Sequence, residues 1–398
     1  MKQLTTVLVL ITAFFIDPVT IRADELADIK ADLVALLSRV EALEAENKAL
    51  RTATEKGNWS DKVSIKGDLR YRYEDIDVEG SNGRERSRVR ARISAKAELP
   101  KDVELGIGFA TGGSDPTSTN QTLGSGGTSK GTVLDFAYFS WNSHPGVNII
   151  GGKFKNVFFR PEKHGLLWDG DYNPEGLAVT YDNGSLFLNA ALNWLESDSK
   201  NASTRAMTGL QAGYVASIND ATLTFGAGFY DFPVKDREVF RGDDDDFFGN
   251  SFTCADPATL SGCTYDNDYE ELQLFAHLKT RIGDQPFTVF ADYVNNSAAS
   301  DHDTGWAAGL VIGKASNPGT WQFSYTYEDK EADAVFAALT DSDVGGGGTD
   351  VKGHIFKGEV AISKNWKVGA IYFDNTDNAH VGTQKDYNRI QFNSAFKF

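Results

Sequence analysis

The chain has 398 residues, a formal net charge of −17 and only two cysteines. This acidic balance argues against general nucleic-acid binding, and two cysteines are too few for a disulfide scaffold. The 39 glycines and the 12% of aromatic residues suit turns and strands better than helices.

The N-terminus has the pattern of a secretory signal peptide over residues 1–23. Lys2 supplies the positive start, residues 4–16 are mostly apolar, and Ala23 is a small residue before the expected cut. The apolar run is too short to span a bilayer as a helix, and no later run approaches 18 apolar residues. We therefore expect an exported protein that is either soluble or a β-barrel.

Residues 24–51 are predicted to form a helix with a coiled-coil seam. Seam positions recur at alternating spacings of three and four, which is the a/d pattern of a heptad repeat. A seam this narrow cannot pack a globular core, so we expect it to join subunits. A single amphipathic helix lying on a surface is the other interpretation. The seam residues are Leu26, Ile29, Leu33, Leu36, Val40, Leu43, Asn47 and Leu50.

After a polar linker, residues 52–60, the period of the sequence changes from 3.5 to 2. Residues 61–398 predict about 16 strands of alternating polar and apolar character. Tight turns such as 100–102 alternate with long polar stretches such as 157–174. The alternation of polar and apolar residues indicates an all-β fold, and because a soluble sandwich has no reason to sort its loops in this way, the loop pattern favours a barrel. We predict a transmembrane antiparallel up-and-down β-barrel, preceded by the α-helical coiled-coil segment.

Arginine stands at every second position from Arg84 to Arg92, and Lys96 keeps the same parity, while interleaved residues such as Val89 and Ile93 can face lipid. An arginine at the lipid midplane costs roughly 2–4 kcal/mol, so the basic side chains must face a wet lumen. Together with the preceding strand they predict a basic stripe along a permeation path. A solvated face that only keeps the lumen wet is the other interpretation. The stripe comprises Lys66, Arg70, Arg72, Arg84, Arg86, Arg88, Arg90, Arg92 and Lys96.

The longest polar stretch, residues 232–268, contains Cys254 and Cys263. In an oxidising compartment we expect these two cysteines to form a disulfide that stiffens the loop. The acidic run 243–246 could bind a divalent cation, but it lacks a calcium-loop signature, so a solvated acidic loop is favoured. We expect no metal and no cofactor. Without an HExxH or GxSxG motif we also expect no enzymatic activity.

Five stretches of the chain carry a family resemblance: GDLRYRYE at 67–74, the arginines at 84–92, GFATGG at 108–113, LLWDGDYNPEGLA at 166–178 and the terminal Phe398. Together they resemble the bacterial outer-membrane "putative porin" family whose members carry an N-terminal coiled coil. The resemblance implies a homotrimer in outer-membrane lipid, with the coiled coil in the periplasm. It also implies passive diffusion of small hydrophilic solutes and ions, and from the stripe we expect a weak anion preference.

General diffusion porins fold their third external loop into the barrel, where it narrows the pore. If the resemblance holds, that loop is 157–174, and Glu162, Asp169 and Asp171 face the basic stripe across a constriction. An ordinary surface loop is the alternative. Two other functions stay open: a structural tether or spacer in the outer membrane with an incidental barrel and, with less support, an outer-membrane hydrolase.

Overall fold

The computed structural model describes residues 31–32, 34–46, 62–200 and 203–398. The chain divides into two compact units, Met1–Lys62 and Val63–Phe398, which we describe separately. The predicted signal peptide and linker lie outside the described residues. No helix among the described residues is long and apolar enough to cross a membrane.

In the first unit, residues 31–32 and 34–46 are helical, and all of them are exposed. Three predicted seam residues, Leu36, Val40 and Leu43, lie in this helix with exposed fractions of 66%, 46% and 54%. A helix with an apolar row open to solvent suits packing against partner helices. The pairing itself stays a prediction. The other seam residues, Leu26, Ile29, Leu33, Asn47 and Leu50, lie outside the described residues.

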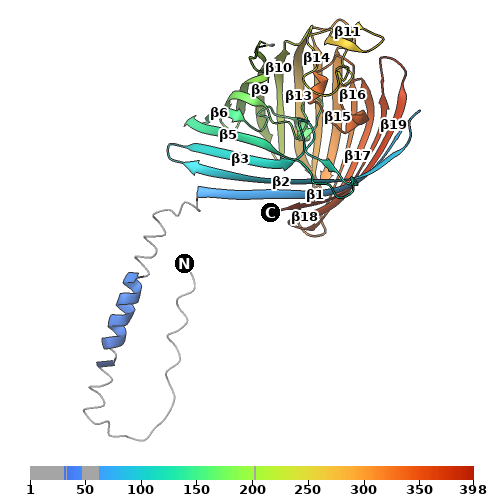
Figure 1. The fold of residues 1–398 in the computed structure, drawn as a ribbon. Coiled ribbons are helices and arrows are strands. Elements are labelled where there is room, and N and C mark those ends of the chain that lie inside the picture. Colours follow the sequence, from blue (N-terminus) through green and yellow to red (C-terminus); the bar gives the residue numbers. More distant parts are fainter. Residues whose placement is uncertain (1–30, 33, 47–61, 201–202) are drawn as a thin grey trace. The chain divides into compact units, whose positions relative to one another are not determined.

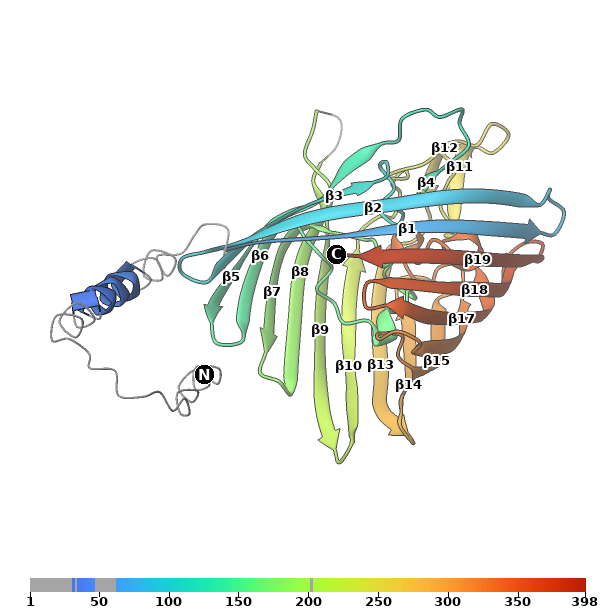
Figure 2. The same cartoon turned by 90° about the horizontal axis from the view of Figure 1, so that it is seen from below.

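The second unit is an antiparallel barrel in which each of 16 long strands pairs with its neighbours along the chain (Figures 1 and 2). This confirms the predicted barrel and its number of strands. The strands are β1 (Val63–Val78), β2 (Arg84–Leu99), β3 (Val103–Thr111), β5 (Thr132–His144), β6 (Val147–Lys153), β7 (Glu175–Asp182), β8 (Leu186–Glu196), β9 (Arg205–Ile218), β10 (Ala221–Phe232), β13 (Tyr269–Ile282), β14 (Gln285–Asn296), β15 (Thr304–Gly313), β16 (Trp321–Lys330), β17 (Val351–Ser363), β18 (Trp366–Asp377) and β19 (Lys385–Lys397).

The barrel closes where the last strand, β19, pairs antiparallel with β1. Two backbone hydrogen bonds seal this junction, from Gly67 N–H to the Phe398 carbonyl at 3.1 Å and from Phe398 N–H to the Gly67 carbonyl at 3.0 Å. A side chain at Gly67 would collide with the ring of Phe398, which explains a glycine at this position. Closure leaves no sheet edge unpaired, as a lipid-exposed sheet requires.

Side chains alternate along the strands, so that apolar residues such as Tyr71, Ile93 and Phe392 are exposed on the outside. The buried apolar residues instead form a core within the barrel, where loop residues such as Trp168 and Phe336 pack against Tyr230 of β10 and Tyr269 of β13. The long loops therefore fill part of the lumen. We call the barrel end with tight turns the short-turn end, and the other the long-loop end.

The long loops contain short elements that the sequence did not predict. A two-residue strand, β4 (Gln121–Thr122), joins the main sheet, and β11 (Phe252–Asp256) forms a separate hairpin with β12 (Ser261–Tyr265). Three 3-10 turns also lie in the loops: η2 (Pro161–Lys163), η3 (Ala337–Leu339) and η4 (Val344–Gly346). In addition, β1 continues to Val78, four residues beyond the stretch GDLRYRYE at 67–74.

Candidate permeation path

The register of β1 against β2 arranges the basic stripe on the lumen wall. Arg70 lies directly opposite Arg90, and Arg72 lies opposite Arg88. Carboxylates flank these two pairs, because Asp68 lies opposite Arg92 and Glu74 lies opposite Arg86. Directly opposed like charges repel each other. The stripe therefore has two arginine pairs at its centre and mixed pairs on either side.

The flanking carboxylates bind several arginines each. Asp68 accepts hydrogen bonds from Arg90 Nη2 at 3.1 Å and from Arg92 Nε at 2.9 Å. Glu74 is fully buried and contacts Arg86 and Arg389, with Arg88 Nη1 3.7 Å away. Because an unpaired buried charge is costly, these contacts stabilise the buried position of Glu74. These carboxylates therefore reduce the net positive charge that the arginines give to the wall.

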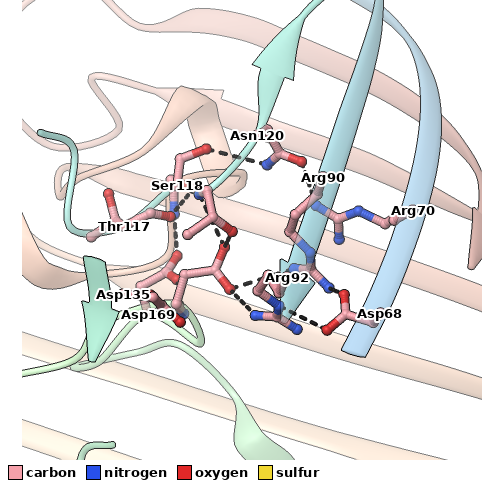
Figure 3. A network of polar contacts seen from close by, with 12 residues as sticks. Asp68, Arg70, Arg90, Arg92, Thr117, Ser118, Asn120, Asp135 and Asp169 are labelled. Atoms are coloured by element: carbon pink, nitrogen blue, oxygen red, sulfur yellow. Dashed lines mark hydrogen bonds and ion pairs between the residues drawn. The ribbon is translucent and has the colours of Figure 1, made fainter. Parts of the chain in front are cut away.

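The remaining basic residues of the stripe lie toward its ends. Lys66 is exposed near the short-turn end, and Arg84 is exposed where β2 begins at the long-loop end. Lys96 donates to Glu104 of β3 at 2.8 Å. Arg70 and Arg90, by contrast, are only partly accessible, and they lie beside the loop segment that contains Ser118 and Asn120 (Figure 3).

Loop 157–174 packs inside the barrel through its apolar residues. Leu166, Leu167 and Trp168 are 0%, 4% and 2% exposed. The Trp168 ring stacks on Tyr172 and meets the edge of Tyr230 on β10, with centroid distances of 5.9 and 5.1 Å. Aromatic contacts of this geometry add to the free energy gained by burial. The loop is thus wedged against the wall around β10.

Among the three acidic residues predicted to face the stripe, Asp171 contacts it. Its Oδ1 atom lies 3.4 Å from Arg90 Nη1 and 3.0 Å from Arg92 Nη1. Its Oδ2 atom accepts hydrogen bonds from the backbone and hydroxyl of Thr119. Burial alone would raise the pKa of this carboxyl, but Arg90 and Arg92 outweigh burial and hold the pKa below its usual value.

Asp169 and Glu162 lie elsewhere, contrary to the expected arrangement. Asp169 accepts hydrogen bonds from the backbone of Asp171 and Ser342, and burial beside Asp341 raises its pKa to about 8. Glu162 contacts His277 Nε2 of β13 at 2.7 Å, and this hydrogen bond lowers the pKa of Glu162. The reason is geometric, because the loop crosses the lumen: Glu162 meets the wall at β13, whereas Asp169 meets the backbone of Ser342 in another loop.

A second loop, residues 331–350, also packs inside and was not predicted to do so. Its Asp343 carboxylate lies 3.0 Å from Arg72 Nη1 and 2.9 Å from Arg389 Nη2. Both arginines are nearly inaccessible, at 3% and 2% exposure. Arg389 of β19 is a lumen residue that the sequence reasoning missed. Its parity, opposite to that of outward-facing Phe392, was the available signal.

Polar residues from loop 111–131 complete the contacts with the stripe. Arg70 Nη2 donates to Asn120 Oδ1 at 2.6 Å, and Arg88 Nη2 donates to Ser118 Oγ at 3.4 Å. No carboxylate lies within ion-pair distance of Arg70 in the described parts of the chain. Arg70 is therefore the central arginine whose charge is least compensated.

On the short-turn side of the arginine pairs lies a cavity of about 1120 Å³, which we call the inner vestibule. Its wall is built from inward-facing residues of β1, β2, β13 and β16–β19, together with loop 157–174. The charged residues lining it are Arg70, Arg72, Arg90, Lys155, Arg160, Glu162, Lys163, Lys279, Lys357, Glu359, Lys367 and Lys397.

The cysteine pair and the acidic run lie in the longest loop. Cys254 and Cys263 face each other across the β11–β12 hairpin and form a disulfide. Within the described residues no group of three or more His, Cys, Asp or Glu side chains is arranged to hold a metal ion. The expectation that no cofactor is needed stays a prediction.

Comparison with known proteins identifies the family. Residues 77–239 and 264–397 match the family model described as "Putative porin". The chain belongs to this porin family. Family and closed barrel together indicate an outer-membrane porin. No curated protein matches the chain in sequence.

Several solved structures share the porin's fold. OprB of Pseudomonas putida is 12% identical, with 85% of this chain and 95% of that chain covered and a TM-score of 0.57. Vibrio cholerae OmpT in its trimer form is 13% identical, with 85% and 100% covered and a TM-score of 0.51. A mutant of the Rh. blastica porin is 14% identical, with 84% and 100% covered and a TM-score of 0.50. At these identities the likeness shows the fold alone.

Proposed function

We propose that this porin forms a water-filled pore for passive diffusion of small hydrophilic solutes and ions, with a weak preference for anions. One observation carries the proposal: the pairs Arg70–Arg90 and Arg72–Arg88 lie side by side on the lumen wall. Fixed positive charge raises the local anion concentration and opposes cations over a Debye length of about 8 Å at physiological salt. The preference should therefore grow as salt is lowered.

The preference is weak because carboxylates offset much of the positive charge. Asp68 and Asp171 lie against Arg90 and Arg92, and Asp343 lies against Arg72. Arginines and carboxylates that face each other across a narrow zone create a transverse field, which favours polar solutes over apolar ones. This role calls for no chemical step. A tether with a closed barrel, in contrast, would conduct little current.

We further propose that the porin is a homotrimer whose residues 24–51 form a periplasmic coiled coil. The exposed apolar row of the described helix supports this assembly, since Leu36, Val40 and Leu43 have no contacts that bury them. The OmpT of Vibrio cholerae has a trimer form, which is a precedent within the same fold.

The test is the reversal potential of single pores in a salt gradient across a planar bilayer. We expect the wild-type protein to favour anions at low salt. The triple variant Arg88→Gln, Arg90→Gln, Arg92→Gln leaves Asp68 and Asp171 uncompensated, so its reversal potential should move toward cation selectivity. Lys364→Gln, in an exposed tight turn, is the control for a charge change outside the lumen. An unchanged reversal potential in the triple variant would show that the stripe does not line the path.

A further inference from the structure

The inner vestibule is strongly basic, although the chain as a whole is acidic. Ten lysine and arginine side chains line it, against two carboxylates, Glu162 and Glu359. Both carboxylates are already engaged: Glu162 contacts His277 at 2.7 Å, and Glu359 accepts from Lys367 at 2.8 Å. The cavity therefore holds a large excess of positive charge.

Half of these cations have no carboxylate partner. Lys155 pairs with Asp135 at 3.3 Å, and Arg72, Arg90 and the lysines beside Glu359 also have acidic neighbours. For the rest, no carboxylate lies within ion-pair distance among the residues that the structure describes. These are Arg70, Arg160, Lys163, Lys279 and Lys397.

Two guanidinium donors beside the vestibule are unsatisfied. The buried Nε atoms of Arg70 and Arg90 have no hydrogen-bond partner within the described chain. Guanidinium groups suit phosphate and carboxylate oxygens because they present several donors in a planar fork.

The volume of the vestibule leaves room for a solute larger than a halide. At about 30 Å³ per water molecule, a cavity of about 1120 Å³ exceeds what a chloride ion would fill. Its cations also come from separate elements: Lys163 from loop 157–174, Lys279 from β13 and Lys397 from β19. A solute with several anionic groups can place a separate group against each of these elements, whereas a single-charge anion has one charge to share among them.

We propose that the inner vestibule is a binding site for polyvalent oxyanions, solutes that carry two or more phosphate or carboxylate groups. This inference rests on the proposed function, because it takes the vestibule to be part of the permeation path. The bound solute would be concentrated on the short-turn side of the arginine pairs. Its anionic groups would contact the unpaired lysines and Arg70.

The experiment measures binding and conduction separately on the full-length protein. Isothermal titration in detergent at low salt uses tripolyphosphate, citrate and inorganic phosphate as probes. We expect tripolyphosphate to bind at least tenfold more tightly than phosphate, and citrate to lie between them. The double variant Lys163→Gln, Lys279→Gln should weaken tripolyphosphate binding about tenfold, while Lys364→Gln should leave it unchanged. Lys279→Gln alone, expected to weaken binding about threefold, replaces the double variant if that fails to fold.

Conductance in planar bilayers then separates this inference from the proposed function. An anion-preferring pore that binds tripolyphosphate no better than phosphate would overturn the vestibule site and leave the porin role intact. Equal binding by wild-type and double variant would place the ligand elsewhere and overturn the site as well. Tight, lysine-dependent binding by a protein that does not conduct would support the site and refute the proposed pore.

Discussion

Replacing Trp168 with alanine should loosen the loop that narrows the pore while leaving the barrel intact. Trp168 is 2% exposed and its ring contacts Phe158, Tyr172, Tyr230 and Phe232. Truncating a buried Trp in this way typically costs about 3–5 kcal/mol. The side chain belongs to loop 157–174 and not to a strand, so the cost falls on the packing of the loop.

A loss of about 3–5 kcal/mol raises the population of displaced loop states by roughly two to three and a half orders of magnitude. The polar contacts of Asp171 with Arg90 and Arg92 remain, so the loop should sample open positions rather than leave the lumen permanently. We therefore expect larger mean conductance and greater open-channel noise. Added protease should also cut within residues 157–174.

The matched control is Trp306→Ala. Trp306 lies on β15 and is 40% exposed on the outer face of the barrel, so the same truncation there leaves the lumen untouched. Single-channel recordings of both variants, with heat-modifiable gel mobility as the folding check, complete the assay. If Trp168→Ala gave wild-type conductance and noise, the loop would be held by its polar contacts, and the apolar wedge would be unimportant.

Two further outcomes are expected. Deleting residues 24–51 should lower the resistance of the oligomer to heat and detergent while the barrel stays folded; unchanged oligomer bands on gels would favour the tether interpretation. The pKa of Asp169 is raised from 3.8 to about 8, so the closed loop favours the protonated form of this carboxyl. The stabilisation of the closed loop is therefore complete below about pH 4, falls as pH rises and is lost above about pH 8. Open-channel noise should therefore increase from pH 4.5 to 8 and then level off, and Asp341→Asn should flatten this rise; a flat wild-type profile would contradict the argument.

Much of the barrel could be predicted from the sequence because lipid imposes a simple rule on each strand. Alternation of apolar and polar residues gave all 16 long strands, including the last one, which ends at Lys397 next to Phe398. The small elements β4 and β11–β12 were missed because a strand of two to five residues is too short to show a period. Their pairing depends on contacts between loops that no local pattern encodes.

The lumen was harder to predict because its contacts join residues far apart in the chain. The side chain of Glu74 reaches Arg389 only because β19 closes on β1, and Asp343 reaches Arg72 only because loop 331–350 folds inward. The apolar run from Ala334 to Leu339, which is buried, was a usable signal, since a solvated loop has no reason to carry it. The uncompensated charge of the stripe therefore depends on carboxylates such as Asp343, which lie outside its two strands.

The net charge of the whole chain is negative, whereas the charge of its lumen is positive, and this difference affects ion selectivity. A net charge of −17 is compatible with a basic pore because acidic residues crowd the loops, as in the run Asp243–Asp246, while the vestibule wall carries the lysines. Charges beyond a Debye length are screened, so acids at the long-loop end cannot cancel the field inside a narrow lumen. Selectivity should then follow the local charge around Arg70 and Lys279, and the isoelectric point of the protein is a poor guide to it. Raising the salt concentration should reduce the anion preference steadily, because it screens the field that the two arginine pairs and the vestibule lysines share.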